Sequence, residues 1–417
     1  MLPIPFAVQQ LLAVLAIVIP SAILTPAAAL TDSLPGVAAT ASPSPAGGVP
    51  AKQQAAKKRA TAPVQAAGVS LPPWQAPQPA HPQNPTNPLA NRLWGVYHGP
   101  QDQLYNVYES ANAQTRAALD TIRVRPRTKW YGNFLADHEI QSRAKDYIVN
   151  SQAGNPTTLS QMAVFRMKPW EHDACTRVPT PVEQASYKTW IRNLAAGIGD
   201  SPTLIVMQPD GPFLWCVPDI KTTSKLLRFA TKTLSNLPNT SVYIDAGAAD
   251  WCENGRRATA ARCAGILKRT GIKWARGFAM DSTHYTGPVD NIRLGSQIVN
   301  HLRARGYGEK HFIVDTAKSG QPTNWLDMKP SAPGELKDNA RTCSRPGMKR
   351  CVTLGIPPTA RPGDPQWGLP ADVAELAARN VDGFVWFGRP WLYNQADPFV
   401  LQRAMDMVRT TPWPEAG

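Results

Sequence analysis

The chain has 417 residues, a length that suits one large domain with appendages or two domains of modest size. Hydrophobic residues make up 43% and charged residues 18%, with 13 Trp and 41 Pro, so the composition excludes a coiled coil and a wholly disordered chain. Lys and Arg outnumber Asp and Glu by 44 to 30, and the net charge of +14 favours anionic partners without identifying one.

Residues 1–29 are expected to form a secretory signal peptide. They carry no charged side chain, contain the apolar stretch 11–24 and end in three Ala residues that suit a signal peptidase. Pro20 interrupts the stretch, which is also short for a membrane span, so an uncleaved anchor is the less favoured alternative. We therefore expect a secreted protein, free or associated with the cell wall, with no stable membrane insertion.

Residues 30–88 are predicted to be a disordered linker. The segment is rich in Ala, Pro, Ser, Gln and Gly, and its one aromatic residue is Trp74. It cannot bury enough apolar surface to offset the entropy lost on ordering. The remaining residues, 89–417, are expected to form a single folded body.

The body alternates between short apolar runs and segments with helical spacing. Nearly continuous apolar runs are typical of strands buried on both faces, and they predict seven strands, at 128–134, 161–167, 203–208, 241–247, 277–281, 311–316 and 383–388. Helices are expected at 187–198, 223–237, 258–267, 292–302, 371–378 and 398–408. This alternation predicts an α/β fold. Because no phosphate-binding glycine motif follows a strand, a closed or nearly closed parallel β/α barrel of the TIM-like type is preferred to a doubly wound nucleotide-binding fold.

Acidic residues lie at or just past the ends of five of the predicted strands: Asp173, Asp210, Asp245, Asp281 and Asp315. One Asp after a strand usually caps a turn or helix, but the C-terminal strand ends of a barrel build its active site. Converging carboxylates raise one another's pKa, so one stays protonated as a general acid while another stays ionised. The set therefore predicts a site that cleaves glycosidic bonds.

Tryptophans also gather near the predicted strand ends: Trp130, Trp251, Trp325, Trp367, Trp386 and Trp391. A glycan cleft needs flat aromatic surfaces for the apolar faces of sugar rings, although core packing is the commoner role of any single Trp. As a group they favour a carbohydrate ligand. No nucleic-acid-binding module and no metal-ligand spacing is recognised.

The six cysteines are expected to be disulfides, because export leads to an oxidising compartment. Their proximity in sequence suggests the pairs Cys252 with Cys263 and Cys343 with Cys351, which leaves Cys175 with Cys216. Six cysteines allow 15 pairings, and the sequence does not choose among them.

Several motifs of the body resemble glycoside hydrolase family 6, the cellulases and cellobiohydrolases that cleave β-1,4-glucan. Residues 241–251, S-V-Y-I-D-A-G-A-A-D-W, resemble the family's V-Y-I-D-A-G-H-A-G-W, and residues 203–210 resemble its strand ending in E-P-D. Segments 169–175, 311–316 and 351–359 match further motifs in the family's order. The resemblance implies a distorted, seven-stranded parallel β/α barrel that uses neither a metal nor an organic cofactor.

The same resemblance implies roles for individual residues. Asp210 would be the general acid, Asp173 the second carboxylate that keeps it protonated, and Asp245 a residue that shapes the site. The family inverts the anomeric configuration, which requires a base to activate water. The substrate-binding residues implied by the match, or standing at the family's binding positions, are Trp130, Trp251, Trp386, Arg389 and Asn394.

The chain also departs from the family pattern. Gln208 replaces the Glu of E-P-D, which removes a carboxylate from beside Asp210, and His172 replaces an Arg. In the loop after the last strand, Asn394 stands at the position of the family's proposed base. Asp397 would replace that base only if the loop is rebuilt, and Arg389 would replace a substrate-binding Lys.

Further departures are Phe165 in place of a Tyr and Asp281 in place of an Asn. The favoured function is a secreted, inverting endo-β-1,4-glucanase, because only residues 389–397 separate the last strand from the final helix, which predicts an open cleft. The alternatives are a cellobiohydrolase and a degenerate scaffold that binds cell-wall glycan or acts on another glycan. The sequence makes no prediction of oligomeric state.

Overall fold

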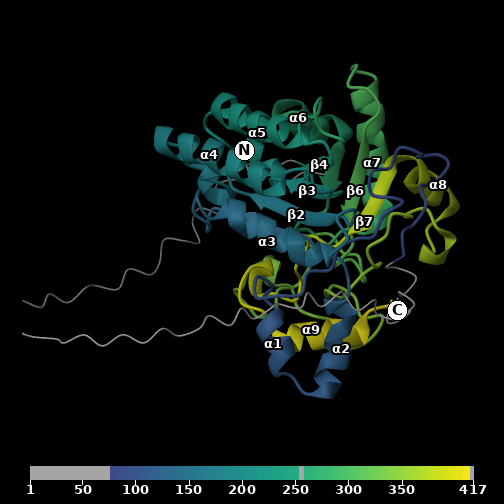
Figure 1. The fold of residues 1–417 in the computed structure, drawn as a ribbon. Coiled ribbons are helices and arrows are strands. Elements are labelled where there is room, and N and C mark those ends of the chain that lie inside the picture. The colour runs from purple at the N-terminus through teal and green to yellow at the C-terminus, as the bar shows by residue number, and fades with distance from the viewer. Residues whose placement is uncertain (1–75, 253–257, 414–417) are drawn as a thin grey trace, which may run out of the picture. The chain divides into compact units, whose positions relative to one another are not determined.

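Seven parallel strands form one sheet whose strand order follows the sequence, from β1 to β7 (Figure 1). Their bounds are β1 Lys129–Gly132, β2 Ser160–Phe165, β3 Thr203–Met207, β4 Thr240–Asp245, β5 Gly277–Met280, β6 His311–Asp315 and β7 Val381–Val385. The structure is a computed structural model that describes residues 76–252 and 258–413. The predicted signal peptide and most of the predicted linker lie outside the described residues. All seven predicted strands are confirmed.

The sheet curls until its first and last strands approach each other. Arg127, just before β1, forms a parallel bridge with Trp386, just after β7, and the Thr128 amide donates to the Trp386 carbonyl at 2.9 Å. Neighbouring strands elsewhere in the sheet pair over several residues. The fold is therefore the distorted seven-stranded barrel that the sequence predicts.

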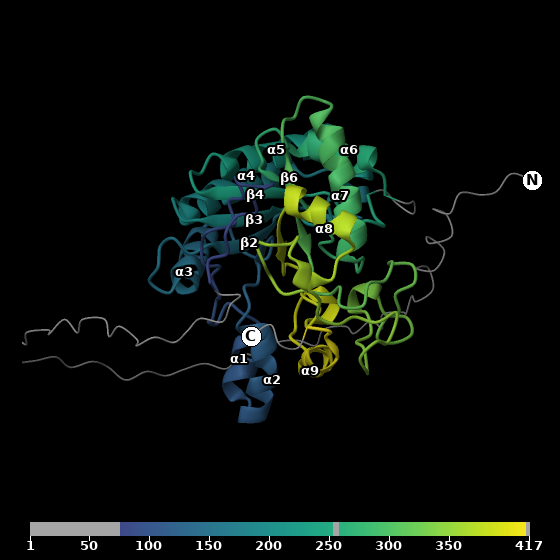
Figure 2. The same ribbon diagram turned by 90° about the vertical axis from the view of Figure 1, so that its right-hand side faces the viewer.

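Helices α3 to α8 alternate with the strands and cover the outside of the sheet, whereas α1, α2 and α9 lie together, apart from them (Figures 1 and 2). The bounds are α1 Tyr105–Ser110, α2 Ala113–Arg123, α3 Ile140–Gln152, α4 Pro181–Ile198, α5 Ile220–Ser235, α6 Ala260–Thr270, α7 Pro288–Arg303, α8 Ala371–Asn380 and α9 Leu401–Thr410. The six predicted helices are confirmed, and α1, α2 and α3 were not predicted. None of the helices within 76–252 and 258–413 is both long and apolar enough to cross a membrane.

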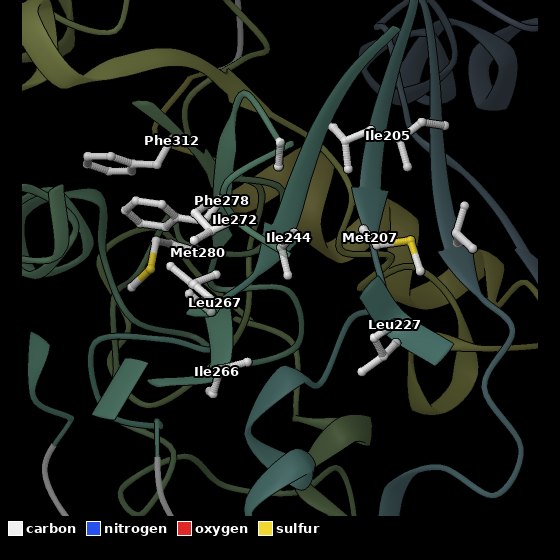
Figure 3. Packing of buried hydrophobic residues seen from close by; sticks show 14 of the residues in the cluster. Ile205, Met207, Leu227, Ile244, Ile266, Leu267, Ile272, Phe278, Met280 and Phe312 are labelled. Atoms are coloured by element: carbon white, nitrogen blue, oxygen red, sulfur yellow. The ribbon is translucent and has the colours of Figure 1, made fainter. Parts of the chain in front are cut away.

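Alternate residues of each strand face the helices and the barrel interior. Ile205, Met207, Ile244, Phe278 and Met280 belong to one cluster with Leu227 of α5 and Leu267 of α6 (Figure 3). The residues between them on the same strands form a second cluster inside the barrel, which contains Leu204, Val206, Tyr243, Ala279, Ile313 and Val385. Because side chains alternate along a strand, the parity that carries Tyr243 inward does the same for Asp245.

The segment before β1 closes the N-terminal end of the barrel. Asn84 donates to the carboxylate of the buried Asp382 at 2.9 Å, and Asn87 donates to the Asp382 carbonyl at 2.7 Å. Gln78 accepts from the Thr359 hydroxyl at 2.8 Å. These side chains are anchored in the body, so the body includes residues 78–88, which the sequence analysis assigned to the linker.

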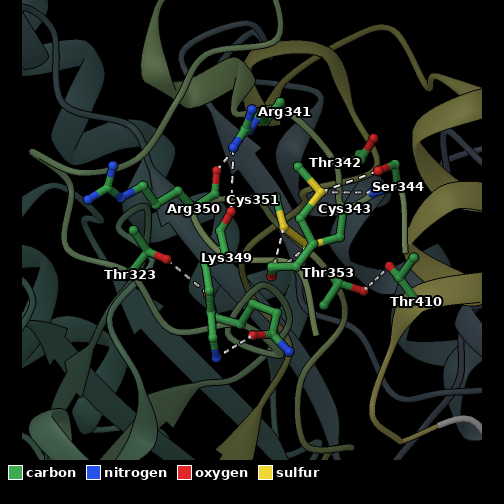
Figure 4. Close-up of a disulfide and its surroundings, with 12 residues drawn as sticks. Thr323, Arg341, Thr342, Cys343, Ser344, Lys349, Arg350, Cys351, Thr353 and Thr410 are labelled. Carbon is green, nitrogen blue, oxygen red and sulfur yellow. Dashed lines mark hydrogen bonds between the residues drawn. A yellow bond between two sulfur atoms is a disulfide. The ribbon is translucent and has the colours of Figure 1, made fainter. Parts of the chain in front are cut away.

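Three disulfides join Cys175 to Cys216, Cys252 to Cys263 and Cys343 to Cys351, the pairs that proximity in sequence suggests. The last of them closes a turn in the long loop between β6 and α8 (Figure 4). Beside it the Arg341 side chain donates to the Arg350 carbonyl at 3.0 Å. The loop is thus held in place by local contacts without forming a helix or strand of its own beyond short 3₁₀ turns, η4 Lys337–Asn339 and η5 Pro365–Trp367.

Candidate active site

Backbone strain marks the loops at the C-terminal ends of the strands. Six non-glycine residues in these loops have φ between 48° and 73°: Glu171, Gln208, Asp210, Asp281, Asn394 and Gln395. Such conformations are unfavourable for L-residues and persist where surrounding contacts impose them, most often at functional sites. The C-terminal end of the barrel is therefore the candidate active site, as it is in other parallel β/α barrels.

Asp210 is the buried acid of this site. It follows β3 and begins the short 3₁₀ turn η3, Gly211–Trp215, and its side chain is 6% exposed. The Thr283 hydroxyl donates to Asp210 Oδ1 at 2.8 Å. Burial, followed by the charges of Asp245 and Glu171, raises the pKa of Asp210 well above its usual range. A raised pKa lets a carboxyl group keep its proton at higher pH than an exposed carboxyl group does, which is the property that a general acid needs.

Asp245 fixes the loops around Asp210. Its Oδ1 accepts from the Gly247 amide at 2.7 Å, and its Oδ2 accepts from the Ser282 hydroxyl at 2.7 Å and from the Gly211 amide at 3.3 Å. Burial raises the pKa of Asp245 to about 6, although these donors favour the ionised form. A Cβ atom at Gly211 would lie 2.3 Å from the Asp245 carbonyl oxygen, which explains why glycine follows the acid.

Two further carboxylates, which the sequence did not single out, face Asp210. Glu171 lies in the turn η2, Glu171–Cys175, after β2, and Asp338 lies in η4 of the long β6–α8 loop. The charges of both raise the pKa of Asp210. Burial raises the pKa of each of them, and in Glu171 the charge of Asp338 adds to it. Only their acidic residue type was visible in the sequence, because neither follows a strand directly.

Asp173 occupies the rim of the site. Its side chain is exposed, and its negative charge acts on Glu171 and Arg177. The Cys175–Cys216 disulfide ties the turn that carries Asp173 to the turn that follows Asp210. The structure thus brings the two predicted carboxylates to neighbouring loops and leaves Asp173 in contact with solvent.

A stack of aromatic rings forms one wall of the site. The His284 imidazole lies between the indoles of Trp251 and Trp325, with both pairs of ring centroids 4.6 Å apart. Asp250 Oδ1 lies 2.7 Å from His284 Nδ1, and Asp250 Oδ2 accepts from the Trp325 amide at 2.7 Å. Burial favours a higher pKa of Asp250, but the interactions with His284 outweigh it and lower that pKa. One face of the predicted platform Trp251 is thus covered by His284.

A basic side chain covers the other predicted platform. The Arg389 guanidinium lies 4.1 Å from the centre of the Trp130 ring, whose Nε1 donates to the Phe387 carbonyl at 2.7 Å. Burial lowers the pKa of Arg389 to about 10, against the charges of Asp397 and Asp210, which raise it. Burial likewise lowers the pKa of Lys129, to about 8. Asp397 itself is exposed, and its charge acts on both cations.

Trp386 does not line the site, which corrects the sequence prediction. Its side chain is 1% exposed, and its Nε1 donates to the Ile356 carbonyl at 2.9 Å. The ring packs in the cluster shared with α2 and α9, near Trp391. The indole points away from the barrel mouth because Trp386 has the parity of helix-facing Phe384, while Val385 and Phe387 face the interior.

Asn394 and Gln395 form the tight turn η6, Tyr393–Gln395, after β7. Gln395 donates from Nε2 to the Thr283 carbonyl at 2.9 Å and lies 3.5 Å from the Tyr285 hydroxyl. Tyr285 in turn lies 3.2 Å from the Asp338 carbonyl oxygen. A hydrogen-bonded frame therefore connects η4, η6 and the loop whose Thr283 contacts Asp210.

The side chains of Asp315 and Asp281, also predicted from the strand ends, bind other residues of the barrel. Asp315 is fully buried, forms an ion pair with Lys318 and accepts from the Phe387 and Gly388 amides at 3.0 Å. Asp281 accepts from the Thr286 hydroxyl at 2.8 Å, and burial raises its pKa. Across residues 76–252 and 258–413, no three His, Cys, Asp or Glu side chains are grouped to hold a metal ion.

A family model described as glycosyl hydrolases family 6 matches residues 95–366. Among curated proteins, endoglucanase A of Cellulomonas fimi is 27% identical over 246 residues, 58% of this chain, and the match spans about half of that protein, 51%. The 1,4-beta-D-glucan cellobiohydrolase CEL6A of Podospora anserina is 31% identical over 172 residues, which cover 34% of this chain and 35% of that protein.

The fold is shared with a solved endoglucanase. The structure of Cel6 from Mycobacterium tuberculosis, in complex with a thio-linked cellobioside, superposes with a TM-score of 0.58. The match covers 77% of this chain and 98% of that chain, at 23% identity. The barrel and its loop order are thus similar, although few residues are identical.

Proposed function

Because the chain belongs to family 6 of the glycosyl hydrolases, we propose that it hydrolyses β-1,4-glucan of the cellulose type, with Asp210 as the general acid. The observation that carries the proposal is the environment of Asp210: the carboxyl is buried at the C-terminal end of β3, and its pKa is raised. A protonated carboxyl at that place can protonate the leaving glycosidic oxygen.

The neighbouring residues have supporting roles in this proposal. Asp245 positions Asp210 through the Gly211 amide, and the rim residue Asp173 adds negative charge near the acid. Trp251 is proposed to contact a sugar unit with the part of its ring that His284 leaves uncovered. The buried Trp130 is proposed to support Arg389, and Arg389 and Asn394 to donate hydrogen bonds to hydroxyl groups. The reaction inverts the configuration at C1, as the resemblance to the family implies.

We assign an endo mode of action to the enzyme. The loop between β7 and α9 is short, and a bridge between Leu392 and Phe399 folds it back on itself, which supports an open cleft. The proposed secretion of the chain agrees with its three disulfides. A cellobiohydrolase is the alternative within the family.

The test is hydrolysis of soluble carboxymethylcellulose and mixed-linkage β-glucan by residues 68–417. We expect new reducing ends, a steep loss of viscosity per reducing end and, by NMR, an α-configured first product. A shallow viscosity loss with cellobiose as the main early product indicates the exo mode instead.

One observation favours a second candidate, a glycan-binding scaffold without catalytic activity. Asn394, at the position of the family's proposed base, cannot accept a proton from water. Glucan binding without any release of reducing sugar is the result expected of such a scaffold, and it contradicts the proposed hydrolase.

A further inference from the structure

We infer that Asp338 is the general base of the proposed hydrolysis, because the last-strand loop carries Asn394 at the position of the family's proposed base and its Asp397 is exposed. The inference rests on the proposed function. It names the group that takes a proton from the attacking water, and it follows from where Asp338 lies and what surrounds it.

The strand order puts Asp338 across the barrel mouth from the acid. Asp210 follows β3, and Asp338 lies in the loop after β6, three strands further along a sheet of seven strands that curls back on itself. Loops that far apart in a barrel face each other over the site. An inverting hydrolase needs its base on the face of the sugar opposite the acid.

The turn that carries Asp338 is held beside the turn that carries Asn394. Turns η4 and η6 contact each other, and the Tyr285 hydroxyl lies 2.8 Å from the Lys337 carbonyl oxygen and 3.2 Å from that of Asp338. Gln395 Nε2 extends the frame to the Thr283 carbonyl. The loop after β6 thus supplies a carboxylate in the turn that contacts the turn of Asn394.

Two acceptors beside Asp338 point to a ligand that donates hydrogen bonds. Gln395 is 6% exposed, and its buried Oε1 receives no hydrogen bond from the described residues. The buried Oδ1 of Asn394 also receives none from that part of the chain. A buried acceptor left unpaired costs about 1–3 kcal/mol, so a water molecule or a sugar hydroxyl is expected to donate here. The turn η4, which carries Asp338, contacts the turn that carries these two acceptors.

The charged groups around Asp338 come from several elements. Burial raises the pKa of Asp338, whereas the charges of His284 in the β5–α7 loop and His172 in η2 oppose that rise. The charge of Asp338 in turn raises the pKa of Asp210 and of Glu171. Such mutual influence is expected of a base that is ionised while the acid opposite is protonated.

The other carboxylates near the acid are less suited to this role. Asp245 accepts three hydrogen bonds from the chain, from Gly247, Ser282 and Gly211. Glu171 follows β2, which adjoins the strand of the acid, so it lies on the same side of the site as Asp210. Asp397 is exposed, and its charge acts on Arg389 and Lys129.

The step is a single displacement. The water oxygen bonds to C1 while Asp338 takes one of its protons, and the bond between C1 and the leaving oxygen breaks. The leaving oxygen takes the proton of Asp210, so no oxidant, reductant or further reactant is required.

The experiment compares wild type, Asp338→Asn and Asp327→Asn, where Asp327 is an exposed acid of the same loop. Each is assayed on soluble β-1,4-glucan across pH, with and without sodium azide, after a melting curve establishes folding. Azide needs no base in order to attack C1. We expect Asp338→Asn to lower kcat about 100-fold or more, to lose the acidic limb of the pH profile and to form a glycosyl azide that restores turnover. Asp327→Asn is expected to match wild type.

An active wild type whose Asp338→Asn variant keeps both its rate and its acidic limb overturns the inference alone. A folded Asp338→Asn variant that loses activity but gains nothing from azide also overturns it, because the residue then serves binding or structure. An inactive wild type overturns the proposed function and, with it, the inference.

Discussion

The Thr283 hydroxyl donates to Asp210 Oδ1 at 2.8 Å, and this hydrogen bond opposes the raised pKa of the acid. Burial and the neighbouring charges favour the protonated carboxyl, whereas the hydroxyl favours the carboxylate. The Gln395 side chain donates a hydrogen bond to the Thr283 carbonyl. The β5–α7 loop therefore tunes the acid that the β3 loop carries.

Replacing Thr283 by Val should shift the alkaline limb of the pH–rate profile to higher pH. The hydrogen bond stabilises ionised Asp210 and so lowers its pKa, and its loss raises that pKa. Activity requires protonated Asp210 and falls as the pH rises through its pKa. In the variant, activity should therefore fall at a higher pH than in wild type. The check is kcat/KM against pH, with Thr283→Ser as the control that keeps the hydroxyl. A limb that moves to lower pH contradicts this account.

Replacing Asp245 by Asn should destabilise the barrel mouth and slow catalysis. An amide turns an NH₂ group toward one of the donors that now face the carboxylate, from Gly247, Ser282 and Gly211. The free energy of unfolding should fall by about 1–3 kcal/mol. The rate falls as well, because Gly211 directly follows the acid. Urea denaturation and turnover test this, with exposed Asp200→Asn as the control expected within about 0.5 kcal/mol of wild type.

The buried ion pair of Lys318 with Asp315 should contribute far more to the free energy of unfolding than an exposed ion pair does. Both side chains are fully buried, and Lys318→Met leaves the Asp315 charge uncompensated beneath the site. The expected loss is about 3–5 kcal/mol of unfolding free energy. The matched change Arg379→Met breaks the exposed pair with Glu375 on α8 and should cost less than about 1 kcal/mol. Equal losses in chemical denaturation would argue against this difference.

Removing the Cys175–Cys216 disulfide should cost more stability than removing Cys343–Cys351. The first closes 41 residues and the second 8, and the loss of loop entropy in the unfolded chain grows with the logarithm of that length. The paired Ser variants should differ by about 1.5 kcal/mol in unfolding free energy. Loss of the Cys175–Cys216 disulfide should also lower turnover, because this disulfide joins the turn of Asp173 to the turn that follows Asp210. The reverse order of stability would refute the entropic account.

The strands were predictable because each is buried on both faces and therefore reads as an apolar run. Helices α4 to α9 were predictable from their apolar faces, such as Tyr187, Ile191 and Leu194 on α4. Helix α1 buries no side chain, and α3 exposes polar residues on most of its surface, so neither left a clear pattern.

The site was predictable only where it lies on the strands. Asp210 and Asp245 directly follow or end a strand, and both lie at the barrel mouth. Glu171 and Asp338 lie in loops whose course depends on tertiary contacts, which no local pattern encodes. Trp386 was wrongly assigned to substrate because a strand-end position does not reveal which face of the sheet its side chain joins.

The central claim is that Asp210 donates the proton to the leaving glycosidic oxygen, and the most direct test is reducing-sugar release from soluble β-1,4-glucan by wild type and by Asp210→Asn. The substitution keeps the shape of the side chain and removes the proton. The account predicts an active wild type and a variant that is at least about a hundredfold slower while it still binds glucan. An Asp210→Asn variant that releases reducing sugar at the wild-type rate would contradict it.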